Sequence, residues 1–275
     1  MNYINLNGKL MEAAAPALRA DNRAFRYGYG LFETMLIRDG AIQLKEYHWR
    51  RLWAGLEQLK FNVPRLFNPQ VLEEEILKTV KKNKAESLCR LRLQVFPGNG
   101  GLYDGGSFGL HYLVECFPLE QHLTDINEVG LVLGIAQDVA KSNDALANMK
   151  TSNALVYATG ARQAKENRWN DALIVNSKGH IIESAIANVF WLKNGKIYTP
   201  PLSEGCIAGV MRAYILDRAK EESIEIGEKA LPVAELMEAD EVFLTNAVRR
   251  IKWVRNIADT TFEGRETRRF SAIIF

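Results

Sequence analysis

The chain has 275 residues, of which 47% are hydrophobic and 25% are charged, and its formal net charge is +2. This length suggests two domains or one large one, with enough apolar residues for a sizeable core. The balanced charge, without a long run of Lys and Arg, argues against a nucleic-acid partner. Because neither a signal peptide nor an apolar run of membrane-spanning length is recognisable, we expect a soluble, cytoplasmic protein with no membrane partner.

The cysteines and histidines give no sign of a metal site. Cys89, Cys116 and Cys206 are widely separated and lack the C-x-x-C spacing, and the four histidines form no H-E-x-x-H motif. Such spacing is typical of reduced, buried thiols in a cytosolic protein rather than of a disulfide framework or a zinc site. We therefore predict no metal.

The first part of the chain is predicted to mix strands with two helices. The dipeptide Asp39-Gly40 separates two apolar segments and is a strong hairpin signal. Asn68 followed by Pro69 is a typical start of a helix. The predicted strands cover residues 3–6, 9–13, 31–38, 41–44, 88–96 and 108–117, and the predicted helices cover residues 45–60 and 68–84. A glycine-rich loop, residues 97–106, joins the last two strands.

Residues 118–128 are polar and weakly patterned, and we interpret them as a linker between a small domain, residues 1–117, and a larger one, residues 129–275. In the larger domain, strands are predicted at residues 129–136, 171–175, 180–183, 188–192 and 241–246, and helices at residues 153–167, 209–222 and 233–239. Strands and helices do not alternate regularly, which favours an α+β fold over a doubly wound sheet.

Lys150 and Glu183 are the most informative pair of residues. A lysine becomes a nucleophile towards an aldehyde only after it loses its proton, and its ordinary pKa is about 10.4. A buried environment next to a cation permits such Schiff-base chemistry. A fixed carboxylate such as Glu183 is the group required to hold a pyridine nitrogen protonated. A lysine by itself is usually a solvated surface residue, so the interpretation depends on the motifs around it.

Three segments could bind a phosphate. Gly209 opens a predicted helix, and the free N–H groups at a helix start bind anions, although a glycine can also simply ease a tight turn. Arg51 carries a planar group suited to phosphate. A third group of backbone N–H donors could come from Thr245-Asn246-Ala247, at the end of a predicted strand.

Together these motifs resemble the class IV pyridoxal-phosphate aminotransferases, a family that includes branched-chain aminotransferases, D-amino acid aminotransferases and aminodeoxychorismate lyases. The resemblance covers nearly the whole chain, and its motifs occur in the family's order. They are Tyr27-Gly28-Tyr29-Gly30-Leu31-Phe32-Glu33, His48-x-x-Arg51-Leu52, Lys150, Glu183-x-x-x-x-Asn188-x-Phe190, Tyr198-Thr199-Pro200, Gly209-Val210-Met211-Arg212 and Glu241-Val242-Phe243-Leu244-Thr245-Asn246-Ala247.

The resemblance implies a two-domain fold type IV enzyme, with a small N-terminal α/β domain and a larger C-terminal pseudo-barrel domain. It implies pyridoxal 5'-phosphate as the cofactor and a homodimer as the assembly. Lys150 would form the Schiff base and move the substrate proton, and Glu183 would pair with the pyridine nitrogen. The other implied cofactor-binding residues are Arg51, Asn188, Val210, Met211, Asn246 and Ala247, and the implied substrate-pocket residues are Tyr27, Phe32, Arg92 and Leu102. Arg92 could equally be a strand arginine that faces solvent.

The subfamily signals disagree, so two reactions stay open. Our leading hypothesis is an aminotransferase that exchanges an amino group between an amino acid and a 2-oxo acid, and Glu33 after Phe32 resembles those enzymes. The alternative is an aminodeoxychorismate lyase that produces 4-aminobenzoate and pyruvate, since residues 209–212 and 245–247 look closest to the lyases. Leu155 stands where branched-chain enzymes have tyrosine, and Leu102 where lyases have arginine. A nucleotide-binding or interaction protein that uses the glycine-rich loop is a third hypothesis, but the loop does not follow the G-x-G-x-x-G or Walker spacing.

Overall fold

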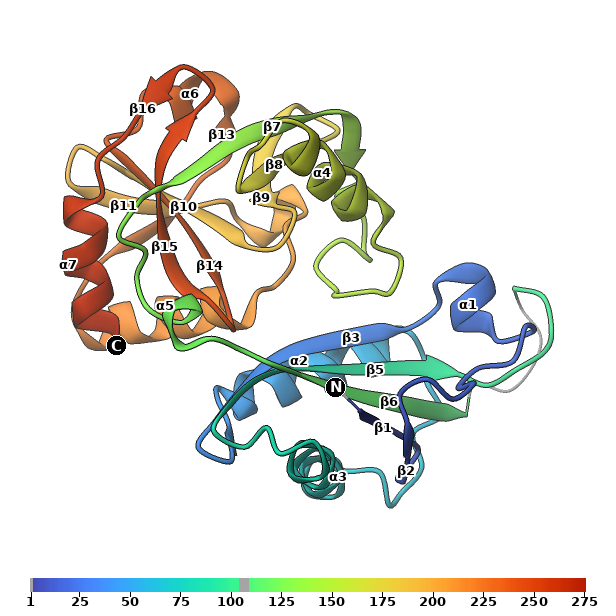
Figure 1. Ribbon diagram of the computed structural model, residues 1–275. Helices are drawn as coiled ribbons and strands as arrows, with labels where there is room; N and C mark the ends of the chain where they lie inside the picture. Colours follow the sequence, from blue (N-terminus) through green and yellow to red (C-terminus); the bar gives the residue numbers. More distant parts are fainter. Residues whose placement is uncertain (1, 104–108) are drawn as a thin grey trace. The chain divides into compact units, whose positions relative to one another are not determined.

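A computed structural model describes residues 2–103 and 109–275 of the chain (Figure 1). The chain folds into two compact units. The first unit runs up to Gln121 and also contains the short segment Met149–Asn153, while the second consists of His122–Asn148 and Ala154–Phe275. The segment that carries Lys150 therefore packs with the first unit, although most of the sequence around it belongs to the second.

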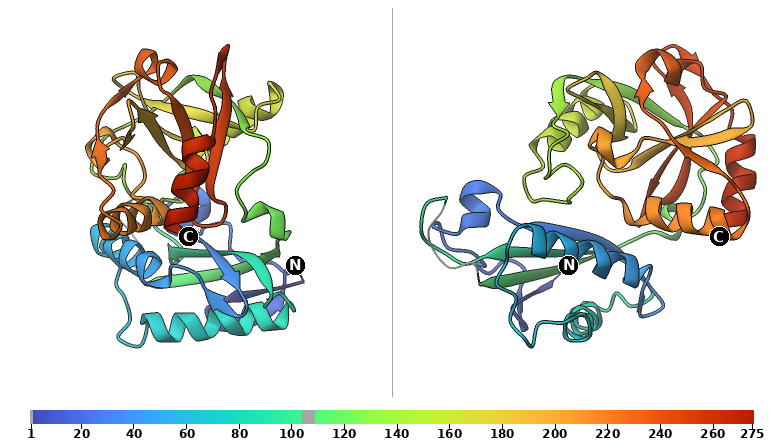
Figure 2. Two further views of the ribbon diagram at one scale, coloured as in Figure 1. Left: turned by 90° about the vertical axis from the view of Figure 1, so that its left-hand side faces the viewer. Right: turned by 180° about the vertical axis from the view of Figure 1, so that it is seen from behind.

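The first unit is a six-stranded antiparallel sheet with helices α2 and α3 packed against it (Figure 2). The strand order is β2-β1-β6-β5-β3-β4. The elements are β1 (Tyr3–Leu6), β2 (Lys9–Glu12), α1 (Arg23–Tyr27), β3 (Leu31–Arg38), β4 (Ala41–Ile42), α2 (Lys45–Gln58), α3 (Pro69–Lys82), β5 (Leu88–Pro97) and β6 (Leu110–Pro118), followed by the 3-10 turn η1 (Gln121–Leu123).

The sequence patterns predicted the strands of this sheet and the helices α2 and α3, because these elements show local signals. The Asn68 side chain caps α3 by accepting a hydrogen bond from Val71 N at 3.0 Å, with Pro69 in the first turn, as the sequence indicated. Apolar residues of α2 and α3, among them Leu52 and Ile76, join residues of β3, β5 and β6 in one buried core. Burial of these helix faces against the sheet is the main stabilisation of this unit.

The second unit is built on a ten-stranded sheet in which six strands close on themselves. The order β10-β14-β15-β7-β8-β9 is closed by a further pairing of β9 with β10, which gives the barrel-like form (Figure 1). The elements are β7 (Leu131–Lys141), α4 (Leu155–Glu166), β8 (Asp171–Asn176), β9 (His180–Ser184), β10 (Asn188–Lys193), β11 (Lys196–Thr199), η2 (Leu202–Glu204), α5 (Val210–Glu221), β12 (Ile226–Glu228), β13 (Leu231–Pro232), α6 (Val233–Met237), β14 (Glu241–Asn246), β15 (Arg250–Ile257), β16 (Thr260–Thr261) and α7 (Arg265–Ile274).

Helices pack on the outer face of this barrel. Helix α4 packs on β7 and β8, whereas α5 and α7 pack on β14, and α7 also contacts β15. The barrel interior is apolar and includes Val189, Trp191 and Leu244. The predicted α+β class is confirmed.

Several elements have no counterpart among our predictions, chiefly α1, the strands β11, β12, β13, β15 and β16, and α7. The contacts at the start of α7 explain why this helix was not predicted. Glu241, at the beginning of β14, accepts hydrogen bonds from Glu266 N and from the N–H and hydroxyl of Thr267. A carboxylate from a distant strand therefore satisfies the free N–H groups of this helix, and no local sequence pattern reports such a partner.

The predicted start of a strand at Phe108, and the loop residues Asp104, Gly105 and Gly106, lie outside the described residues. The three cysteines are buried and free, as expected. Across residues 2–103 and 109–275, no cluster of His, Cys, Asp and Glu has the arrangement of a metal site. None of the helices in these ranges is both long and apolar enough to cross a membrane.

Candidate active site

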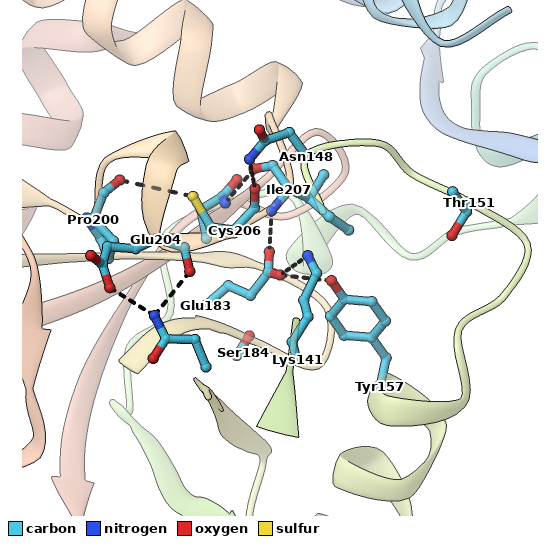
Figure 3. Close-up of polar contacts among 12 residues, drawn as sticks. Lys141, Asn148, Thr151, Tyr157, Glu183, Ser184, Pro200, Glu204, Cys206 and Ile207 are labelled. Carbon is cyan, nitrogen blue, oxygen red and sulfur yellow. Dashed lines mark hydrogen bonds and ion pairs between the residues drawn. The ribbon is translucent and has the colours of Figure 1, made fainter. Parts of the chain in front are cut away.

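A buried carboxylate, Glu183 near the end of β9, lies at the centre of a hydrogen-bond network in the second unit (Figure 3). Its Oε1 accepts hydrogen bonds from Lys141 Nζ at 2.8 Å and from the Tyr157 hydroxyl at 2.7 Å. Its Oε2 accepts one from the backbone N–H of Ile207 at 2.9 Å. A buried carboxylate is tolerated only when paired in this way. The sequence singled out Glu183, and the structure shows what fixes it.

Tyr157, on the first turns of α4, is a permanent hydrogen-bond donor to this carboxylate. Burial, and then the charge of Glu183, raise the pKa of Tyr157 above its ordinary 10. Its hydroxyl therefore keeps its proton at any pH at which the protein would work. Lys141 Nζ lies 5.2 Å from the centre of the Tyr157 ring, so the lysine contacts both other members of the group.

The closed barrel places three polar side chains in one row across adjacent strands. Asn188 of β10 is paired with Glu183 of β9 on one side and with Thr245 of β14 on the other. Residues that lie directly opposite each other in an antiparallel pair point to the same face of the sheet. Because the neighbours Val189 and Leu244 point into the barrel core, Asn188 and Thr245 point away from it.

The segment that precedes α5 ties several of these groups together (Figure 3). Asn188 Nδ2 donates to Ile207 O at 2.9 Å, and Ile207 N in turn donates to Glu183. Asn148, two residues before Lys150, donates to Leu202 O and Cys206 O and accepts from Ala208 N at 2.9 Å. The loop that opens α5 is thus held from two sides.

Helix α5 begins at Val210, with Gly209 as its N-cap and without a side-chain capping bond. A Cβ on Gly209 would lie 1.8 Å from Asn188 Oδ1, so any other residue here requires Asn188 or the helix start to shift. Val210 and Met211 form the first turn, where backbone N–H groups have no partner within the helix. The N–H groups of an uncapped helix start can bind an anion, as the sequence predicted for these residues.

Asn246 is the last residue of β14, and Ala247 begins the turn to β15. Asn246 Oδ1 accepts hydrogen bonds from Val248 N at 3.1 Å and Arg249 N at 2.7 Å, and its amide donates to Ile186 O at 3.2 Å. The Asn246 side chain therefore shapes the turn. Asn188 and Asn246, both predicted to bind the cofactor, use their amides to hold the surrounding backbone.

Lys150 belongs to the first unit, where its segment runs beside the start of β3. Phe32 N donates to Lys150 O at 2.9 Å, and Ser152 N donates to Gly30 O at 2.8 Å. Lys150 Nζ lies 4.4 Å from the centre of the Phe32 ring. The Arg92 guanidinium also lies over this ring, at 3.9 Å, so Phe32 contacts two cationic side chains.

Arg51 of α2 forms a bidentate ion pair with Glu33 of β3. Its Nε and Nη2 lie 2.8 and 2.5 Å from the two carboxylate oxygens, and His48 Nδ1 lies 2.6 Å from Oε2. Burial raises the pKa of Glu33, but the charges and hydrogen bonds of Arg51 and His48 outweigh it and lower the pKa to about 2. Glu33 is therefore ionised, and it fixes the plane of the Arg51 guanidinium.

The remaining predicted pocket residues are also in the first unit. Tyr27 ends α1, and its ring lies 4.8 Å from the ring of Tyr103. Leu102, in the glycine-rich loop, is exposed. Arg92 donates to Gln94 Oε1 at 2.9 Å, and burial lowers its pKa. Arg92 is therefore neither fully solvated nor fully buried.

The sequence did not predict that Lys141, Tyr157 and His48 would take part in these hydrogen-bond networks. Lys141 ends a long strand that was predicted to stop at residue 136, and Tyr157 lies on a helix whose pattern indicated only packing. Glu33 and Thr245 were noticed only as letters of motifs. The one available signal was the position of Lys141 and Tyr157 within ten residues of Lys150 on either side.

Comparison with solved structures establishes the fold. An aminotransferase of Mycobacterium tuberculosis, described as hypothetical and solved in a form with bound PLP, superposes with a TM-score of 0.84 at 21% identity. The match covers 99% of this chain and 97% of that one. The match includes both units described here, and it confirms the predicted fold type IV architecture.

Sequence comparison establishes the family. The family model for class IV amino-transferases matches residues 30–257. The aminodeoxychorismate lyase of Bacillus subtilis is 27% identical over 276 residues, with 98% of this chain and 92% of the relative covered. The branched-chain-amino-acid aminotransferase of Escherichia coli is 25% identical over 268 residues, with 93% and 85% covered. The chain belongs to the class IV aminotransferase family.

Proposed function

We propose that this protein is a pyridoxal-phosphate-dependent aminotransferase that moves an amino group between an amino acid and a 2-oxo acid. The observation that carries the proposal is the buried Glu183 carboxylate, held by three donors beside the loop that opens α5. A fixed, charged acceptor is what a protonated pyridine nitrogen requires. The free thiols agree with a cytoplasmic enzyme.

The residues of the second unit fit such a cofactor. Within the described residues, the buried Thr245 hydroxyl has no hydrogen-bond partner, and Thr245 is paired with Asn188 across the strands. Gly209 leaves room that any Cβ would fill, and the first N–H groups of α5 have no capping side chain. An orphaned hydroxyl and an uncapped helix start provide donors for a phosphate, and the nearby carboxylate provides an acceptor for a ring nitrogen.

Bound pyridoxal phosphate supplies a carbonyl that condenses with amines and a ring that accepts electrons from the substrate Cα. Lys150 would supply the amine that holds the cofactor, and after a substrate amine has taken its place there, the released neutral Nζ would take the proton from the substrate Cα. Glu183 keeps the ring nitrogen protonated. In the second unit, the N–H groups of Val210, Met211 and Ala247 are the proposed phosphate donors. In the first unit, the Arg51 guanidinium is the side chain that the family resemblance assigns to the phosphate. Phe32, Tyr27, Arg92 and Leu102 are the proposed substrate contacts.

Aminodeoxychorismate lyase is the second candidate function, and specific residues favour it. The segments 209–212 and 245–247 look closest to the lyases, and Leu155 replaces the tyrosine of branched-chain enzymes and is 74% exposed. Both reactions begin with removal of the Cα proton by Lys150, and they differ in whether a leaving group is then expelled. The residues that bind the cofactor are the same in both.

The test begins with the colour of the purified protein. We expect visible absorbance in the presence of pyridoxal phosphate, bleached by borohydride and absent in Lys150→Ala. Lys165→Ala, which changes an exposed lysine, is the matched control and should stay yellow. A wild-type protein that pyridoxal phosphate cannot turn yellow would refute both candidate functions.

The reaction is decided by substrates. The yellow protein is incubated with a panel of amino acids and 2-oxo acids, and separately with aminodeoxychorismate without any amino acceptor. New amino acids in the first mixture support the aminotransferase. Pyruvate and 4-aminobenzoate in the second, with no transfer in the first, would replace it with the lyase.

A further inference from the structure

We infer that Lys141 and Tyr157 are positioning residues that hold Glu183 so that its Oε2 is the atom offered to the cofactor's ring nitrogen. The inference deepens the proposed function and rests on it. Lys141 and Tyr157 were identified from the contacts of the carboxylate, because neither belongs to the motifs that indicate the family.

The acceptor capacity of the carboxylate gives the first argument. Each carboxylate oxygen can accept about two hydrogen bonds in its plane. Across the described residues, Oε1 accepts two, from Lys141 Nζ and the Tyr157 hydroxyl, whereas Oε2 accepts one, from Ile207 N. Oε1 is therefore saturated, and Oε2 retains one acceptor position. A ring N–H can pair with Glu183 only through Oε2 unless one of the donors to Oε1 leaves.

Burial of the ion pair gives the second argument. The side chains of Lys141 and Glu183 are only 11% and 3% exposed, so water contributes little to stabilising either charge. Removing one partner of such a pair leaves a buried charge without compensation. Without Lys141, the carboxylate keeps only the Tyr157 and Ile207 donors, so its negative charge is less well stabilised and its orientation less well fixed.

The geometry of the three donors gives the third argument. They come from separate elements: Lys141 from the end of β7, Tyr157 from α4 and Ile207 from the loop before α5. Figure 3 shows them converging on the carboxylate. A carboxylate fixed from three elements cannot rotate about its last torsion without losing a hydrogen bond. Its orientation is therefore set before the cofactor arrives.

The experiment compares holoenzymes of the wild type, Lys141→Met, Lys141→Arg and Tyr157→Phe. The readouts are the dissociation of pyridoxal phosphate on dilution and the pH dependence of the visible absorbance. We expect Lys141→Met to weaken cofactor binding about tenfold, because the carboxylate that pairs with the ring nitrogen loses the cation that neutralises it and one of the bonds that orient it. Its absorbance should also respond to pH differently from the wild type. Lys141→Arg, which keeps the charge, should restore both readouts.

Tyr157→Phe should weaken cofactor binding in the same direction and by a smaller factor, because Lys141 still neutralises Oε1. Two matched controls should leave both readouts unchanged: Lys165→Met, an exposed lysine on the same helix as Tyr157, and Tyr198→Phe, a tyrosine stacked on Trp191. If Lys141→Met does not fold, Lys141→Arg and Tyr157→Phe carry the test.

The outcomes separate this inference from the proposed function. A wild-type protein that stays colourless with pyridoxal phosphate overturns the proposed function, and this inference with it. A yellow wild type whose Lys141 and Tyr157 variants lose thermal stability but keep the affinity and the pH response overturns the inference alone. In that case the two residues merely support the fold.

Discussion

Glu33 is a buried carboxylate that accepts hydrogen bonds from two side chains of one helix, one of which, Arg51, also balances its charge. Arg51 binds both of its oxygens, and His48 Nδ1 binds Oε2. An ionised carboxylate only accepts hydrogen bonds, so His48 Nδ1 must carry the proton and donate it. Burial lowers the pKa of His48, against the opposing effect of Glu33. Arg51 and His48 thus keep Glu33 ionised at neutral pH, and Glu33 in turn orients the Arg51 guanidinium, which is proposed to bind phosphate.

This arrangement predicts a pH dependence of stability. The pKa of Glu33 is lowered from 4.5 to about 2, so its contribution is fully present above about pH 4.5 and disappears as the pH falls through about 2. We expect Glu33→Gln to reduce the free energy of unfolding at pH 7 by roughly 3 kcal/mol. The difference from the wild type should shrink between pH 5 and pH 2. Urea unfolding followed by tryptophan fluorescence measures it, and a difference independent of pH would contradict the assignment.

The sequence does not show that Glu33 and Glu183 are alike, each being a buried carboxylate held by donors from other elements. Glu183 was chosen because its motif matches a family, while Glu33 was noted only as a letter that separates subfamilies. In both cases the structure adds the donors, which are brought in from other strands and helices. The role of Arg51 as a phosphate ligand stays a prediction, and Glu33 supplies a physical reason for the orientation of its side chain.

At the scale of elements, the start of α5 is the point where most of the second-unit contacts meet. Its loop donates Ile207 N to Glu183, accepts from Asn188 and is bonded twice by the Asn148 amide. Gly209 then allows the chain to pass against Asn188. A helix start held in this way keeps its free N–H groups in place, which reduces the entropy lost on binding an anion.

Gly209→Ala tests this element. The new Cβ would meet Asn188 Oδ1 at 1.8 Å, so Asn188 must turn and lose its bond to Ile207 O, or the helix start must shift. We expect a loss of about 1–3 kcal/mol in stability and weaker binding of pyridoxal phosphate. Thermal unfolding and absorbance titration measure the two effects.

The double variant Gly209→Ala with Asn188→Ala is the control, because it removes the atom that clashes. If the contact is the cause, the combined loss of stability must be smaller than the sum of the two single losses. Additive losses would show that Gly209 is required for another reason.

At the scale of the whole molecule, the first unit has large apolar side chains that are exposed to solvent, which is unfavourable for a monomer. Phe25 of α1 and Leu102 and Tyr103 of the glycine-rich loop are 73%, 67% and 79% exposed. The two segments are neighbours, because Arg23 Nη2 donates to Tyr103 O at 2.8 Å and the Tyr103 ring lies 4.8 Å from the Tyr27 ring. Exposed apolar surface of this kind commonly marks an interface, and we propose that a second copy of the chain covers it.

Light scattering on the eluting protein tests the homodimer. We expect a mass of about 62 kDa, twice the chain mass of 31.1 kDa. The double variant Phe25→Glu and Leu102→Glu should move the mass towards that of one chain, since it places charge in an apolar contact. Leu66→Glu changes an exposed leucine elsewhere in the unit and should leave the mass at its wild-type value. A wild-type mass equal to that of one chain would refute the dimer.

The sequence by itself determined the family, the α+β class and most of the elements that carry local signals. Period-2 and helical patterns, the Asn68 cap and the turn at Asp39-Gly40 depend on neighbouring residues, so they can be read without a fold. Residues 1–117, 118–128 and 129–275 stay the predicted domains. The structure groups the Lys150 segment with the strands of the first unit, because its backbone bonds are made to Gly30 and Phe32.

Only the tertiary structure decided which side chains serve the candidate site. Lys141 and Tyr157 meet Glu183 because β7 runs parallel to β8 and α4 packs on both strands. The closure of β9 on β10 places Asn188 between Glu183 and Thr245. Such contacts join residues far apart along the chain, whereas propensity and periodicity report only on near neighbours. The physical reason is that burial and charge pairing arise from contacts between distant segments of the folded chain, and a short window of sequence does not include both partners.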